Sequence, residues 1–183
     1  MNKLLSILVI LVLFSFDLSG QSKSGFIISS NYSIGNLIDG EKNPRVESAI
    51  ASGKFQLDYS IVNWDHTIMR LGVGYQILKC RDSRIGYMQF PIVFQRFIKA
   101  NKTGFNTSLV LMPSYYFGEK LELCNNKNIQ NFNIEIAIRA GKVFERNNHK
   151  YSLEFEATVP MGSIQKFGIM KYIVYGVKVG YYI

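Results

Sequence analysis

The chain has 183 residues, of which 48% are hydrophobic and 19% are charged, a balance that excludes a disordered protein and leaves room for one domain. The formal net charge is +8, but the Lys and Arg residues are dispersed and form no basic run, so we expect no nucleic-acid partner. Two cysteines are too few for a disulfide scaffold.

The first twenty residues have the three parts of a secretory signal peptide. Lys3 supplies the positive charge, residues 4–16 form an apolar run, and Ser19-Gly20 is a small-residue cleavage site. The apolar run is shorter than the ~20 residues that a spanning helix needs, which disfavours the alternative of an uncleaved anchor. We therefore expect a cleaved signal peptide at residues 1–20 and a single mature domain at residues 21–183.

After Gln21, hydrophobic residues recur at every second position, which is the period of a β-strand with one apolar and one polar face. Strands in soluble proteins have about 5–6 residues, whereas a tilted strand that crosses a membrane needs about 9–11. Most of the alternating segments have the longer length, which favours a membrane barrel over a soluble sandwich. The segments are 25–35, 54–62, 67–79, 85–98, 105–118, 131–145, 150–160 and 168–183.

Long and short connections alternate between these segments. Residues 36–52, 80–84, 119–130 and 161–167 form the longer connections, and residues 63–66, 99–103 and 146–149 form tight turns. Bacterial outer-membrane barrels have short periplasmic turns and longer extracellular loops. We therefore predict an all-β fold, a single antiparallel transmembrane β-barrel of about eight strands in an up-and-down meander. Both termini would be periplasmic, and the four longer connections would be extracellular.

In a membrane barrel the apolar face meets lipid and the polar face lines the lumen. An eight-stranded barrel is just wide enough inside for side chains to fill it, which predicts a plugged lumen rather than an open pore. A narrow ion path or a ligand site is the alternative. Four acids and four bases fall on the predicted lumen face and would form a structural network of ion pairs: Lys54, Asp58, Arg70, Glu135, Arg139, Glu154, Glu156 and Lys178.

No catalytic, cofactor-binding or metal-binding motif stands out, so we expect no cofactor and no enzymatic activity. His66 and His149 both fall in predicted periplasmic turns, and neither has the Ser and Asp neighbours that acyl hydrolysis needs. Cys80 and Cys124 fall in neighbouring extracellular loops. An exported protein meets an oxidising compartment, so a disulfide between them is expected, with two unpaired thiols as the alternative.

Four features carry a resemblance to a known family. They are the cleavage region Ser19-Gly20-Gln21, the stretches Arg70-Leu71-Gly72-Val73-Gly74-Tyr75 and Gly86-Tyr87-Met88-Gln89-Phe90-Pro91-Ile92-Val93, and the closing stretch from Tyr175 to Ile183. The mature chain resembles the small outer-membrane protein β-barrel domain family of the OmpA and OmpX type, common in Bacteroidota. The last stretch resembles an insertion strand of the kind that the barrel-assembly machinery recognises, but it ends in Ile rather than Phe. The resemblance implies the fold and the location, and it transfers no catalytic residue.

The first hypothesis for function is a non-enzymatic, monomeric outer-membrane protein. It would contact membrane lipid and lipopolysaccharide and have a structural or surface-interaction role through its extracellular loops. The second is a soluble, secreted, lipocalin-like barrel that binds an apolar ligand, and the third is a lipid-modifying membrane enzyme. The first two differ in which face of the barrel is apolar.

Overall fold

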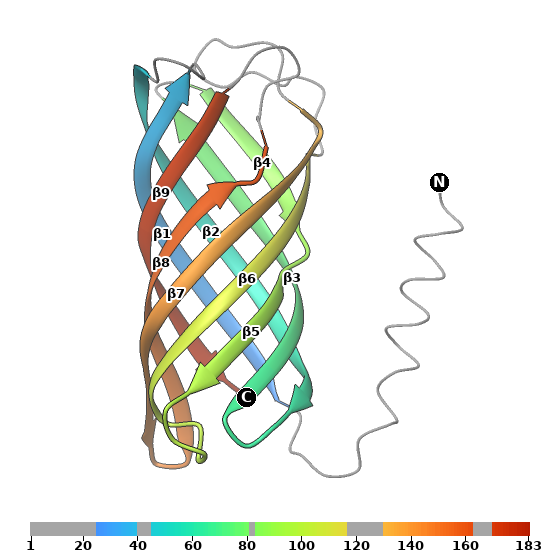
Figure 1. The fold of residues 1–183 in the computed structure, drawn as a ribbon, viewed down its shortest axis with the longest axis vertical. Helices are drawn as coiled ribbons and strands as arrows, with labels where there is room; N and C mark the ends of the chain where they lie inside the picture. The colour runs from blue at the N-terminus through green and yellow to red at the C-terminus, as the bar shows by residue number, and fades with distance from the viewer. Residues whose placement is uncertain (1–24, 40–44, 81–82, 117–129, 163–169) are drawn as a thin grey trace, which may run out of the picture.

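The computed structural model describes residues 25–39, 45–80, 83–116, 130–162 and 170–183. Within these ranges the ordered elements are antiparallel β-strands (Figure 1). No helix in the described part of the chain has the length and apolar character needed to cross a membrane. The strands are β1 (Phe26–Asp39), β2 (Arg45–Asn63), β3 (Thr67–Cys80), β4 (Ser83–Gln89), β5 (Ile92–Phe97), β6 (Gly104–Tyr116), β7 (Phe132–Arg146), β8 (His149–Pro160) and β9 (Met170–Tyr182).

The strands form a closed ring in which chain neighbours pair in order. The first and last strands close it: β1 pairs antiparallel with β9, from Ile27 opposite Tyr182 to Asp39 opposite Met170. Every described strand therefore has a partner on each side. Closure of this kind satisfies the backbone N–H and C=O groups that an open sheet edge would expose.

The segment 85–98 was predicted as one strand and is interrupted at Phe90-Pro91, which separates β4 from β5. Proline has no N–H to donate to the ladder, which explains the interruption. The register against β3 does not change across it, since Gly74 lies opposite Gln89 and Leu71 lies opposite Ile92. β4 and β5 are thus two halves of one barrel strand, and the prediction of an eight-stranded antiparallel barrel is confirmed.

Two of the predicted extracellular loops are largely strand. The predicted loop 36–52 is wrong because β1 continues to Asp39 and β2 already begins at Arg45, where the two strands pair with each other. The predicted loop 80–84 is wrong because Cys80 pairs directly with Ser83, which leaves only residues 81–82 as the connection. The signal peptide and most of the predicted loops 119–130 and 161–167 lie outside the described residues.

The side chains alternate in the sense expected for a membrane barrel. Phe55, Leu153 and Val179 point outward and are 50–56% exposed. On the same strands, the side chains buried in the barrel include Lys54, Asp58, Glu154, Glu156 and Lys178. A lipocalin-like barrel would have its apolar face inward, so this arrangement does not fit that alternative.

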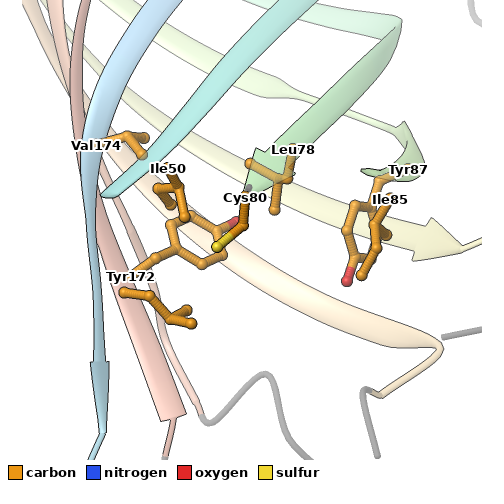
Figure 2. Close-up of a cluster of buried hydrophobic side chains, with 8 residues drawn as sticks. Ile50, Leu78, Cys80, Ile85, Tyr87, Tyr172 and Val174 are labelled. Carbon is orange, nitrogen blue, oxygen red and sulfur yellow. The ribbon is translucent and has the colours of Figure 1, made fainter. Parts of the chain in front are cut away.

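We expected a polar lumen throughout, but the interior also holds apolar clusters. One of them, Val93, Val110, Met112 and Ala137, lies in the middle beside the charged network. At the end that carries the longer connections, an apolar cluster lies in the lumen: Leu37, Ile50, Leu78, Cys80, Ile85, Tyr87, Tyr172 and Val174 (Figure 2). At the opposite end, Ile68, Phe97 and Val143 pack together with Tyr182. These inward apolar residues occupy the polar positions of the alternation near the strand ends, where burial against each other compensates for the loss of polar contacts.

Candidate functional site

The charged network in the barrel interior centres on Glu156 of β8. Its carboxylate lies between two cations, with Oε1 3.0 Å from Nζ of Lys54 and Oε2 2.5 Å from Nε of Arg139. Lys54 also lies 3.6 Å from Oε2 of Glu135. These four side chains are at most 2% exposed, and each of them has an oppositely charged partner, which offsets the cost of burying its charge.

The network crosses the full width of the barrel. Arg139 on β7 donates a hydrogen bond from Nη2 to Oε1 of Gln56 on β2, 3.3 Å away. With β4 and β5 counted as one strand, three barrel strands separate β2 from β7 in either direction around the ring. Arg139 and Gln56 thus extend from opposite walls of the barrel and meet at its centre.

A second group surrounds Asp58 in the next layer toward the short-turn end. Nζ of Lys178 lies 3.8 Å from Oδ2 of Asp58. Gln56 donates to both oxygens of the same carboxylate, at 2.5 and 2.6 Å. Gln56 therefore links the pair to Arg139 and joins the two charged groups into one network.

The two remaining predicted lumen charges lie nearer the short-turn end. Glu154 accepts a hydrogen bond from Nε2 of Gln95 at 3.0 Å. Arg70 is buried with its guanidinium 5.9 Å from the centre of the Tyr182 ring. No described carboxylate lies within salt-bridge distance of Arg70. The structure thus buries all eight predicted residues and joins most of them, whereas Arg70 lies over the Tyr182 ring.

Sequence reasoning missed the uncharged members of the network. Gln89 donates to Gln76 at 2.7 Å and to Oε1 of Glu135 at 3.3 Å, and Gln76 donates to Ser52 at 3.0 Å. Thr158 accepts from Lys54 and donates to Glu156. Gln76, Gln89 and Thr158 occupy polar positions of the predicted alternation, which was the signal available in the sequence, whereas Ser52 falls in the predicted loop 36–52.

Several buried donors in this region have no hydrogen-bond partner among the described residues. They include Nε and Nη1 of Arg70, Nη1 of Arg139, Nδ2 of Asn106 and Oγ of Ser108. Buried donors of this kind are usually satisfied by ordered water. We therefore expect a hydrated layer near the short-turn half of the network.

Glycines make room for the network at two positions. A Cβ at Gly176 would overlap the backbone oxygen of Tyr32 and Oγ of Ser33, and a Cβ at Gly72 would overlap Oδ1 of Asp58. Any larger residue there would displace either the neighbouring strand or a network side chain.

The two histidines lie apart from this network. His66 lies in the turn between β2 and β3, and His149 is the first residue of β8, where its Nδ1 lies 2.7 Å from the Tyr181 hydroxyl. Both are exposed at the short-turn end. The described residues include no cluster of His, Cys, Asp and Glu that could hold a metal ion.

Cys80 is fully buried at the end of β3, within the apolar cluster of the loop end. The part of the chain that the structure covers has no free cysteine. Cys124 lies outside the described residues, so the Cys80–Cys124 bond stays a prediction.

The fold of the chain is similar to those of two solved outer-membrane proteins. Over 85% of this chain and 96% of the other, the barrel superposes on the crystal structure of neisserial surface protein A with a TM-score of 0.56 and 10% identity. The chain has the fold of the small outer-membrane β-barrels. The outer membrane protein OprG of Pseudomonas aeruginosa also matches, with a TM-score of 0.44 and 14% identity over 91% of this chain and 99% of that one. No family model and no curated protein matches the sequence.

Proposed function

We propose that the chain is a non-enzymatic, integral β-barrel protein of the bacterial outer membrane. The observation that carries the proposal is the inversion of the barrel, with apolar side chains outside and paired charges inside. In water, this outer surface would expose a continuous apolar belt that soluble monomers do not tolerate. In a bilayer, the same belt is the favoured surface.

We further propose that the lumen is closed and that the protein is not a diffusion pore. The Arg139–Gln56 contact spans the centre of the barrel. Apolar clusters occupy the interior on both sides of this contact. Ions crossing the barrel would have to displace paired charges and then pass two apolar layers, which is costly at each step.

The longer connections would face the cell exterior and provide the surface-interaction role. Exposed cations lie near this end on the outer wall, with Lys79 directly opposite Arg84 in the register and Lys171 on β9. Such cations support contact with the phosphate groups of lipopolysaccharide. The closing strand β9 is the segment that the barrel-assembly machinery would recognise, and the closed ring supports a monomer.

Membrane fractionation, gel mobility and bilayer recordings test the proposal together. We expect the protein in the outer-membrane fraction, a shift in gel mobility between unheated and boiled samples, and no stepwise conductance in planar bilayers. Recovery as a monomer that stays soluble without detergent would overturn the membrane assignment. Reproducible conductance steps would overturn only the closed lumen.

A further inference from the structure

Two cations on the outer wall of the barrel have no carboxylate partner among the described residues. Arg96 lies on β5 between two outward neighbours, Phe94 at 44% and Ile98 at 73% exposure. Lys142 lies on the outward face of β7. Neither has a described carboxylate within salt-bridge distance. An unpaired charge on a lipid-facing strand is costly unless it reaches the interface or meets an opposite charge.

A groove of ≈ 600 Å³ lies beside Arg96 on the outer wall, near the short-turn end. The small side chains of Thr107 and Ala140 lie opposite each other in the register and leave the depression. Arg96 lies opposite Thr107 on the other side, so the cation borders the groove. Phe105 and Ile98, two of the most exposed apolar residues, form its walls, and His66 lies at the turn end.

The ammonium group of Lys142 lies near two aromatic rings, one of which belongs to the groove-lining residue Phe105. Its Nζ lies 5.6 Å from the centre of the Phe105 ring and 5.2 Å from that of Phe144. Phe105 also lines the groove, so the two cations flank one apolar side chain. The groove is therefore largely apolar, with the positive charges of Arg96 and Lys142 at its border.

We propose that this groove binds one anionic glycerophospholipid, with the phosphate at Arg96 and Lys142 and an acyl chain along Thr107 and Ala140. Charge complementarity argues for a phosphate headgroup, because guanidinium and ammonium groups donate charge-assisted hydrogen bonds to phosphate oxygens. The inference rests on the proposed insertion in the outer membrane. In that orientation the short-turn end faces the periplasmic leaflet, which consists of phospholipid rather than lipopolysaccharide.

Native mass spectrometry of the full-length mature protein, folded in zwitterionic detergent, tests this site. The probes are phosphatidylglycerol and phosphatidylcholine of the same chain length, which differ in net charge. We expect one phosphatidylglycerol bound per barrel with about tenfold preference over phosphatidylcholine. The double variant Arg96→Gln/Lys142→Gln should lose the preference.

Two further variants separate the site from general electrostatics. Lys99→Gln/Arg146→Gln removes the same charge from exposed positions at the same end and should keep the preference. Ala140→Trp fills the groove without changing the charge and should reduce phosphatidylglycerol binding. The inference is wrong if Arg96→Gln/Lys142→Gln keeps the preference, if the Lys99/Arg146 pair loses it equally, or if Ala140→Trp binds normally. Tighter binding of lipopolysaccharide than of phosphatidylglycerol at Arg96 and Lys142 would make the proposed occupant wrong.

Gel mobility with and without boiling, measured for each variant in phosphatidylcholine vesicles, separates the two proposals. If the wild-type protein does not fold into these vesicles, the proposed membrane function fails. If it folds but shows no preference between the two lipids, the lipid site alone fails.

Discussion

Arg139 lies directly opposite Glu156 in the register of β7 and β8, and its Nε lies 2.5 Å from the Glu156 carboxylate. Both side chains are only 1% exposed. The same carboxylate holds Lys54 on its other oxygen. One carboxylate thus bridges two buried cations, and Glu135, 3.6 Å from Lys54, supplies the second negative charge.

Glu156→Gln should destabilise the folded barrel by about 3–5 kcal/mol, because it leaves Lys54 and Arg139 buried without their shared counter-charge. The free energy of unfolding in urea, measured in phospholipid vesicles, checks this. The matched control is Glu145→Gln, which removes an exposed carboxylate 3.8 Å from Lys150 and should cost less than about 1 kcal/mol. Equal effects of the two substitutions would show that the interior network contributes nothing beyond a surface pair.

Gly176→Ala should destabilise the barrel by about 1–3 kcal/mol, because the added methyl group overlaps the backbone of β1. Gly53→Ala is the control, since no atom lies within 4 Å of the added Cβ at that outward position. Unfolding in urea distinguishes the two. If Gly176→Ala is as stable as Gly53→Ala, the packing of β9 against β1 is looser than the structure shows.

Phe155→Arg should cost about 2–4 kcal/mol of folding free energy in a bilayer, because the residue lies in the middle of β8 and points outward. Tyr151→Arg, four positions nearer the strand end on the same face, should cost only about 0–1 kcal/mol. The ratio of folded to unfolded protein in vesicles, read from gel mobility, gives both values. The absence of any dependence on position would argue against a bilayer around β8.

Cys80 and Cys124 should react with a thiol-specific label only after reduction, because we predict a disulfide between them. Labelling in denaturant, with and without reductant, followed by mass spectrometry, measures this. Cys80→Ser should then lower the stability by about 2–4 kcal/mol. Two labelled thiols in the unreduced, denatured protein would disprove the bond.

The strand alternation predicted which way side chains point, because the period of two holds wherever a strand is amphipathic. It separated Leu153 and Phe155 from Glu154 and Glu156 correctly. It failed at residues 36–52, where small residues such as Ser48, Ala49 and Ala51 give too little contrast between faces for a strand to be recognised. The interruption at Pro91 was missed because that residue falls in phase with the inward face.

The contacts within the lumen could not be predicted from the sequence. Lys54 and Glu156 are 102 positions apart, and Gln95 and Glu154 are 59 apart. Which inward residues share a layer depends on the stagger of the strands when the ring closes, and alternation within single strands carries no information about it. The apolar clusters at the two ends were missed for the same reason, since their members come from separate strands.

The pairing of β1 with β9 has a consequence for biogenesis. β1 pairs with β2 along one edge and with β9, residues 170–182, along the other. The second edge of β1 is therefore satisfied only when β9 is present. A polypeptide that lacks β9 would leave β1 and its own last strand with unsatisfied edges, which a hydrocarbon environment penalises heavily. We therefore expect only a chain that contains β9 to reach a stable, closed barrel in the membrane.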